Sequence, residues 1–212
     1  MKRHGQRALQ TAAVEQVAGR RRRAALAGHE GDPETARRFL ADPDASVRAA
    51  ALGALVRLGA VTDADTTAAR DDEEPAVRRR LCELAPALPP TDFRPLLEDA
   101  DESVVEAACF ACGEQGDRGA VARLSEIAAS HDDPLCRESA VAALGAIGDE
   151  GGLPAILGAL GDKATVRRRA VIALAPFDGP DVAAALRAAL EDRDWQVRQA
   201  AEDLTGRDPS EL

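Results

Sequence analysis

The sequence VRAAALGALVRLG, residues 47–59, carries the pattern that organises this chain. A Val-Arg pair is followed by alanines and leucines at the spacing of one helix face. Related stretches follow it, with first residues Val77, Val104, Cys136, Val166 and Val197. We call the first residue of each stretch its anchor, and the anchors recur about every thirty residues, a period typical of repeat arrays. An acidic or Pro-containing turn precedes each stretch, where carboxylates can cap a helix.

Shorter helical runs lie between these stretches, for example PETARRFLA at 33–41 and AVARLSEIAAS at 120–130. Each repeat is therefore a helix pair, and because one pair cannot bury its own apolar stripe, neighbouring pairs must stack. The fourth residue after every anchor is small or apolar, and so is the eighth in all but the last stretch. At 100° per residue both columns lie within about 80° of the anchor, so they form one buried face. We expect an all-α fold, an α-α superhelix or solenoid of about six helix pairs.

Both ends of the array depart from the repeat pattern. Near the start, AAVEQVAGRRRRAALAG resembles an inner helix without the Val-Arg pair, and near the end Glu202, Asp203 and Thr205 replace apolar residues. We expect one repeat domain over 1–212, with a degenerate half-repeat and basic arm at 8–32, repeats at 33–193 and a polar cap at 194–212.

The anchor pairs resemble those of HEAT repeats of the short bacterial type, the type of phycobilisome lyases and deoxyhypusine hydroxylase. They are Val47–Arg48, Val77–Arg78, Val166–Arg167 and Val197–Arg198. The resemblance covers roughly residues 33–207, and it is specific for fold but not for function, because such arrays serve many roles.

In this family an Asp in the turn pairs with an Arg six residues later and so forms a ladder between repeats. The resemblance implies such pairs at Asp42/Arg48, Asp72/Arg78 and Asp192/Arg198. The spacing is shifted by one at Asp132/Arg137 and Asp162/Arg167, and at Asp99 it is lost because Val105 takes the place of the arginine. We interpret these arginines as structural.

Composition excludes several classes of protein. No apolar run approaches the eighteen residues of a membrane span, and the basic N-terminus lacks the apolar core of a secretion signal. The net charge of -10 disfavours a general nucleic-acid binder, although residues 1–40 hold nine Lys/Arg and four Asp/Glu. We expect a cytoplasmic monomer that does not bind nucleic acid or membranes.

Residues for chemistry are scarce. Cys109 and Cys112 have the spacing of a zinc or redox pair, but they occupy apolar repeat columns, as does Cys82, and Cys136 replaces an anchor valine. The histidines are scattered, at His4, His29 and His131. We expect no catalytic residue, no metal and no cofactor.

The related enzymes need residues that this chain lacks. Deoxyhypusine hydroxylase holds two irons with repeated His-Glu pairs, whereas the matching position here is Arg137–Glu138, and arginine cannot ligate iron. A phycobilisome lyase needs aromatic walls for a tetrapyrrole, and a HEAT-like alkylpurine glycosylase needs a basic cleft. With no Tyr and a single Trp, at Trp195, the chain has little aromatic wall, and its six repeats are acidic overall, which argues against a basic cleft. We expect Trp195 to pack against the cap.

The second and sixth residues after each anchor point away from the core and should line the concave groove of the solenoid. Phe110 and Ile172 are apolar there, with Ala142 between them. Charged residues surround this strip at Arg79, Glu138 and Arg168, in the pattern of a partner-binding surface. The alternative is that a neighbouring helix covers Phe110 and Ile172.

Two basic repeats with a late proline, at Pro86 and Pro176, flank two acidic ones. The prolines should bend or end their helices.

We therefore predict a non-catalytic scaffold or adaptor whose groove binds another protein, with an acidic segment meeting Arg79 and Arg168. The groove residues are Arg79, Phe110, Glu138, Arg168 and Ile172. One alternative is a lyase- or hydroxylase-like enzyme or an enzyme-associated subunit. Another is nucleic-acid contact through a basic arm at Arg20, Arg21, Arg22 and Arg23, together with Arg37–Arg38.

Overall fold

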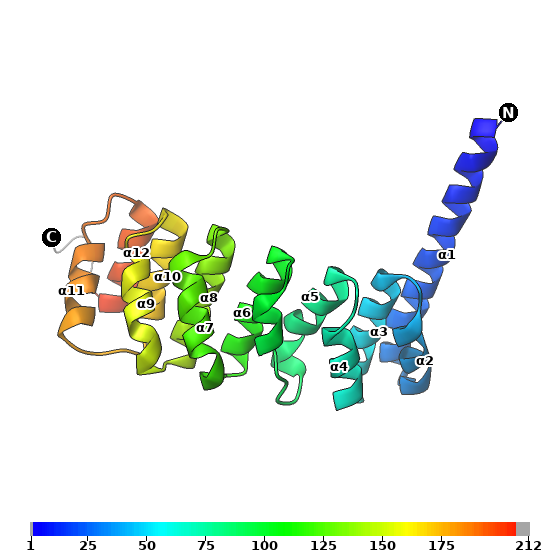
Figure 1. The fold of residues 1–212 in the computed structure, drawn as a ribbon, viewed down its shortest axis with the longest axis horizontal. Coiled ribbons are helices and arrows are strands. Elements are labelled where there is room, and N and C mark those ends of the chain that lie inside the picture. Colours follow the sequence, from blue (N-terminus) through cyan, green and yellow to red (C-terminus); the bar gives the residue numbers. More distant parts are fainter. Residues whose placement is uncertain (1, 207–212) are drawn as a thin grey trace. The chain divides into compact units, whose positions relative to one another are not determined.

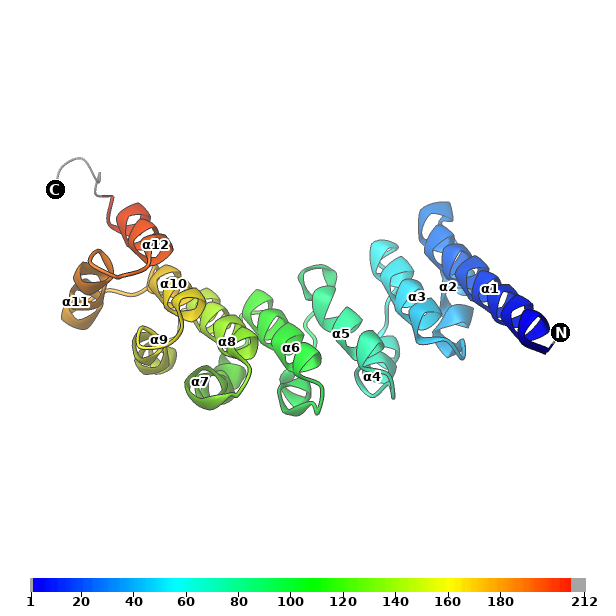
Figure 2. The ribbon, with the colours of Figure 1, turned by 90° about the horizontal axis from the view of Figure 1, so that it is seen from above.

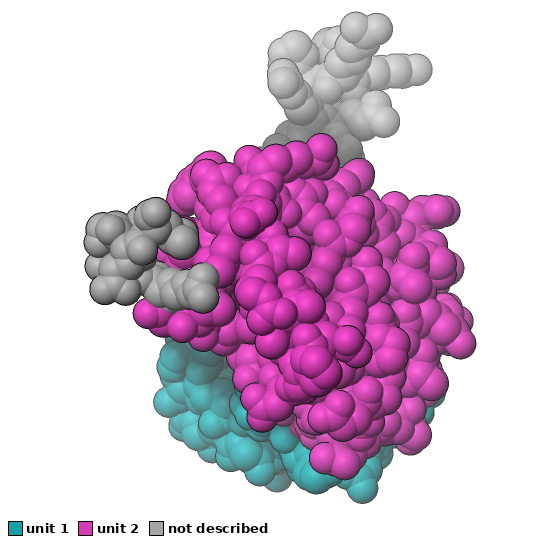
Figure 3. All heavy atoms as spheres, turned by 90° about the vertical axis from the view of Figure 1, so that its left-hand side faces the viewer, with its two compact units in different colours: residues 1–91 teal, residues 92–212 magenta. Residues whose placement is uncertain are grey.

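The computed structural model describes residues 2–206, with side chains from residue 14 onward. The chain divides into two compact units, residues 1–91 and residues 92–212, coloured separately in Figure 3. Each unit is a stack of helix pairs, and the structure contains no strand within the described residues, so the predicted all-α solenoid is confirmed. The single domain over 1–212 stays a prediction, and residues 207–212 of the predicted cap lie outside the described part.

Unit 1 begins with a long helix that stacks on the first full repeat. Its elements are α1 (Lys2–Glu30), α2 (Pro33–Arg38), η1 (Phe39–Ala41), α3 (Ala45–Arg57), α4 (Asp63–Arg70), α5 (Pro75–Glu83) and η2 (Ala85–Ala87). The helices α1, α3 and α5 pack in sequence, while α2 packs on α1 and α3, and α4 on α5. The half-repeat of the sequence is therefore a complete inner helix.

Unit 2 holds the other repeats. Its elements are η3 (Arg94–Glu98), α6 (Glu102–Glu114), η4 (Arg118–Ala120), α7 (Val121–Ser130), α8 (Pro134–Ile147), η5 (Glu150–Gly152), α9 (Leu153–Ala159), α10 (Ala164–Ala173), α11 (Pro180–Ala189) and α12 (Trp195–Thr205). Figure 2 shows α6, α8, α10 and α12 in one row, with α7, α9 and α11 in a second row beside it.

The anchor columns form the core, as the periodicity predicts. The fourth residues after the anchors are all buried, at Ala51, Leu81, Ala108, Ala140, Ala170 and Ala201. The eighth are buried at Leu55, Ala85, Cys112, Leu144 and Leu174, whereas Thr205 is exposed. The fourth column is alanine in all but one repeat, and such small side chains let neighbouring helices approach closely.

Acidic turns start the inner helices and prolines end two of them. The carboxylates of Asp44, Asp101, Asp133 and Asp194 each accept a hydrogen bond from the backbone N–H two residues later, at 2.9 to 3.0 Å. The helix α5 stops at Glu83, before Pro86, and α10 stops at Ala173, before Pro176. The expected effect of both prolines is confirmed.

Arginines that follow the anchors link successive turns. Arg48 donates from Nε and Nη2 to both carboxylate oxygens of Asp72, at 2.8 and 2.7 Å, and from Nη1 to the carbonyl oxygen of Asp42 at 2.9 Å. The same bidentate pairs form between Arg20 and Asp42, Arg137 and Asp162, and Arg167 and Asp192. We call each such pair a rung.

The predicted partners within a rung are wrong. The carboxylate that meets Arg48 belongs to the next turn, and Asp42, six residues earlier, offers its backbone carbonyl instead. Arg78 and Arg198 likewise donate to the carbonyl oxygens of Asp72 and Asp192, both at 2.7 Å. The arginine side chain is long enough for Nη1 to bind a carbonyl in the turn before its own helix. Its Nε and Nη2 then bind the carboxylate of the neighbouring turn.

The two shifted pairs follow the same rule. Arg137 donates from Nη1 to the carbonyl of His131 at 2.7 Å and to that of Asp132 at 3.1 Å, so His131 is the residue equivalent to Asp42. Arg167 donates to the carbonyl of Asp162 at 2.8 Å, and its carboxylate partner is Asp192.

Candidate functional site

An apolar stripe crosses three neighbouring inner helices of unit 2. It consists of Phe110 on α6, Ala142 on α8 and Ile172 on α10. Phe110 is 43% exposed and Ile172 39% exposed, and Ala142 between them is half-buried. The alternative in which a helix of the array covers Phe110 and Ile172 is therefore wrong.

Two of the predicted charged residues flank this stripe. Glu138 on α8 accepts a hydrogen bond from Arg169 on α10 at 3.3 Å, so its charge is already partnered. Arg168 is exposed, and among the described residues none forms an ion pair or hydrogen bond with its guanidinium. The Arg168 guanidinium is therefore available to a ligand.

Arg79 lies on α5 and therefore belongs to unit 1. Its Nε lies 3.4 Å from a carboxylate oxygen of Glu83, one turn later on the same exposed helix face. Such an exposed pair is weak and can exchange for another carboxylate.

A cavity of about 330 Å³ opens at the α10–α12 end of the stripe. Its walls are formed mainly by Arg168, Ile172, Ala175, Trp195, Gln199 and Asp203. Trp195 is 64% exposed, so the prediction that it packs against the cap is wrong. Trp195 is the first residue of α12, and helical side chains lean toward the N-terminus of their helix, so its ring extends past the helix end.

The packing of α10 explains why a cavity forms here. Earlier in the row the backbones approach closely, since a Cβ added to Gly113 or Gly145 would lie only 2.9 or 2.7 Å from the Cα of Ala143 or Ala173 on the next helix. The equivalent residue of α10 is Ala175, beyond the end of the helix, and it lines the cavity instead.

The polar residues of the cavity carry opposite charges. Asp203 accepts a hydrogen bond from the Gln199 side-chain amide at 2.9 Å, while Arg168 lies unpaired on the α10 side. Trp195 and Ile172 add apolar surface. The cavity can therefore hold an apolar group and a carboxylate together.

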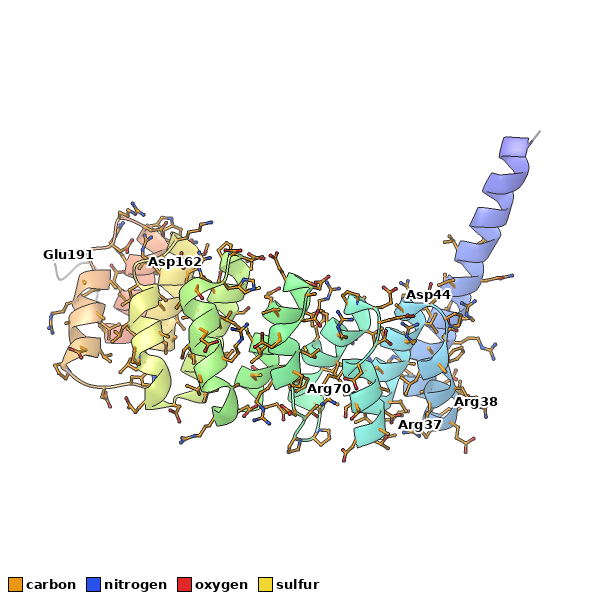
Figure 4. The ribbon with its side chains drawn as sticks, viewed as in Figure 1. Arg37, Arg38, Asp44, Arg70, Asp162 and Glu191 are labelled. Carbon is orange, nitrogen blue, oxygen red and sulfur yellow. The ribbon has the colours of Figure 1, made fainter. Side chains whose placement is uncertain are left out.

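The predicted basic arm is part of the folded stack. Arg20 is a rung residue, with its Nε 2.8 Å from Asp42, and this corrects its assignment as a free basic residue. Arg21, Arg22 and Arg23 are exposed on α1. On α2, Arg37 pairs with Asp65 at 3.0 Å and Arg38 lies 3.7 Å from Glu34. Both arginines are labelled in Figure 4.

The cysteines behave as core residues. All four are buried, and burial raises the pKa of the Cys112 thiol to about 12 and that of Cys136 to about 11. Burial also raises the pKa of the Cys109 thiol strongly. Protonated thiols in apolar surroundings are poor nucleophiles and poor metal ligands.

The histidines have structural partners. His29 lies 2.9 Å from Nη1 of Arg57, and Nδ1 of His131 accepts the backbone N–H of Asp133 at 3.1 Å. The side chain of His4 lies outside the described part. Within the described side chains, no three His, Cys, Asp or Glu residues gather as a metal site requires.

Comparison with protein families identifies the repeat. The family of HEAT repeats matches residues 90–175, and the PBS lyase HEAT-like repeat matches residues 166–192. The resemblance seen in the sequence is thereby confirmed. No curated protein matches this sequence well enough to count as a relative.

Solved structures with similar folds are distant in sequence. The Escherichia coli protein YibA is 19% identical, with a TM-score of 0.55 over 77% of this chain and 66% of its own. A designed armadillo repeat protein in complex with the peptide (KR)4 is 16% identical, with a TM-score of 0.50 over 92% and 91%. Human deoxyhypusine hydroxylase is 20% identical, with a TM-score of 0.48 over 88% and 78%. At these identities a similarity shows the fold alone.

None of the helices in the described residues is both long enough and apolar enough to cross a bilayer.

Proposed function

Because the chain carries HEAT repeats, we propose that it is a non-catalytic scaffold that binds a segment of a partner protein on the stripe of unit 2. The exposure of Phe110 and Ile172 on one face is the observation that carries this proposal. Large apolar side chains grouped on a charged surface are typical of interaction sites, because partner burial removes them from water.

The charge at this surface favours an acidic partner segment. Arg168 is unpaired, whereas Glu138 is already neutralised by Arg169. A carboxylate of the partner can bind the guanidinium fork of Arg168 with two hydrogen bonds. Arg79, in unit 1, stays a separate prediction as a contact for an acidic segment, and its pair with Glu83 there is weak. Cytoplasmic residence and a monomeric state stay predictions.

The enzyme alternative has no support among the described side chains. Where the hydroxylase has a His-Glu pair, this chain has Arg137–Glu138, and both side chains already form ion pairs, with Asp162 and Arg169. The nucleic-acid alternative is reduced to Arg21, Arg22, Arg23 and the weakly paired Arg38, since Arg20 and Arg37 are held by Asp42 and Asp65.

Affinity capture followed by mass spectrometry tests the scaffold proposal. The bait would be the wild type, the Phe110→Ser/Ile172→Ser variant, or the control Leu135→Ser, which removes an exposed leucine outside the stripe. Circular dichroism would first confirm that all three are folded. A partner retained by wild type and control but lost by the stripe variant supports the proposal. Equal capture by all three, or capture by none, contradicts it.

A further inference from the structure

We propose that the cavity between α10 and α12 is an anchor site for one large apolar side chain of an acidic peptide. The acidic residue that follows this side chain in the peptide binds Arg168 through its carboxylate. This inference rests on the proposed function and adds to it the chemistry of the bound segment. It also assigns Trp195, which was not among the groove residues predicted from the sequence, as a binding residue.

The shape and walls of the cavity define the apolar part of the ligand. Its volume of about 330 Å³ is at the lower end of the range for ligand pockets, which suits one side chain with its flanking backbone. Trp195 and Ile172 are both exposed beside it, and Leu204 completes the apolar wall. An aliphatic or aromatic side chain placed against the indole would bury both itself and Trp195.

The polar groups of the cavity define which peptide residue follows the apolar side chain. Arg168 has no described partner, so a carboxylate placed beside it gains charge-assisted hydrogen bonds without displacing an existing ion pair. Gln196 and Gln199 present side-chain amides, which can both donate to and accept from a peptide backbone. Asp203 repels a second carboxylate at the α12 wall, so the acidic residue is directed to the α10 side.

Single-stranded nucleic acid is the competing ligand, because a base could stack on Trp195 and a phosphate could bind Arg168. Asp203 in the cavity and Glu138 beside it add negative charge around that single arginine. Phosphate binding generally relies on several cations, so the observations favour the peptide.

Tryptophan fluorescence gives a direct test, because Trp195 is the only tryptophan of the chain and tyrosine is absent. The probe is an acetylated and amidated Ser-Gly-Leu-Glu-Ser-Gly peptide, with two controls in which Leu becomes Ala or Glu becomes Gln. We expect a saturable change in Trp195 emission with the first peptide. Binding should weaken about tenfold or more with either control peptide.

Protein variants supply the matching controls. Arg168→Ala should weaken binding of the Leu-Glu peptide about tenfold and abolish its preference over the Gln peptide. Arg187→Ala removes an exposed arginine on α11 outside the cavity and should leave binding unchanged. No emission change up to millimolar peptide, or equal binding of the Glu and Gln peptides, would overturn the anchor site. So would a stronger response to a single-stranded oligonucleotide.

The failure of this inference is distinguishable from failure of the scaffold proposal. If Phe110→Ser loses the captured partner while Trp195→Ala retains it, the stripe binds the partner and the anchor site is wrong. If both variants capture the partner as well as wild type does, the scaffold proposal itself is contradicted.

Discussion

Val105 on α6 takes the position of the rung arginine, and His131, in the turn before α8, takes the position of the rung aspartate. Val105 follows its anchor as Arg137 and Arg167 follow theirs, and it is only 3% exposed. Nδ1 of His131 accepts the N–H of Asp133 at 3.1 Å, just as Asp192 accepts the N–H of Asp194 at 2.8 Å. Both partners of one ion pair are therefore replaced together, and α6 packs against α8 without a rung, through apolar residues and one hydrogen bond from Cys136 Sγ to the carbonyl oxygen of Glu102 at 3.3 Å.

Restoring that rung should require both residues. Val105→Arg alone places an unpaired cation at a buried position and should lower the free energy of unfolding. Adding His131→Asp should recover about 1–3 kcal/mol of coupling energy in a double-mutant cycle measured by urea denaturation. Val105→Lys with His131→Asp is the control, because a lysine cannot form the bidentate fork and should recover less. Additive effects of the two substitutions would contradict the assignment of this rung.

The rungs make stability depend on pH at the acidic side. Hydrogen bonds from Arg137 and Arg167 hold the pKa values of Asp162 and Asp192 below the ordinary value. A lowered pKa in the folded state means that the stabilisation is complete above the unfolded pKa of about 4 and is lost as the pH falls through the lower folded value. Urea midpoints measured from pH 7 to pH 2 should therefore decline mainly below about pH 4.

Asp192→Asn checks the cause of that decline. It leaves the buried Arg167 without its counter-charge and should cost about 3 kcal/mol at pH 7, with a shallower loss of stability in acid. Asp178→Asn, at an exposed carboxylate outside the rungs, should change stability by less than about 0.5 kcal/mol. An identical acid profile for wild type and Asp192→Asn would show that other carboxylates control it.

Replacement of Gly145 by alanine should destabilise the fold, although the residue lies inside a helix. Intrinsic propensity alone predicts a gain of about 1 kcal/mol, but the new Cβ would lie 2.7 Å from the Cα of Ala173 on α10. Because backbone must move to relieve this contact, Gly145→Ala should instead lower the free energy of unfolding by about 1–3 kcal/mol. Gly158→Ala on α9 meets nothing within 4 Å and should be neutral or stabilising. Equal effects of the two variants in thermal melts would contradict close backbone contact.

The four buried thiols should resist alkylation while the protein is folded. All four are buried, and the raised pKa values of Cys109, Cys112 and Cys136 leave almost no thiolate at pH 8, so reaction with a thiol reagent should be slow until the protein unfolds. We expect the native reaction to be at least about 100-fold slower than the reaction in urea. An added surface cysteine in Ala129→Cys, at an exposed position of α7, should react at once and calibrates the reagent. Fast native labelling of Cys109 would contradict the tight α6 core.

The repeat period was sufficient to predict the helices and their buried columns, because a thirty-residue pattern constrains every repeat at once. The exposed positions of Phe110 and Ile172 followed from the same angular argument. The carboxylate partner of each rung arginine could not be predicted in this way. Two carboxylates lie within reach of each arginine, and sequence spacing does not tell which of them its guanidinium binds. Trp195 was missed because its exposure depends on where α10 ends and how α12 packs beside it.

The rungs also bear on how such an array can change its length through evolution. In unit 2 each rung joins residues 25 positions apart, across a whole outer helix and both of its turns. Inserting a few residues into an outer helix would move the aspartate away from its arginine, whereas duplicating or deleting a complete repeat keeps every remaining pair in register. Gaining or losing a whole repeat therefore disturbs the structure less than inserting or deleting a few residues.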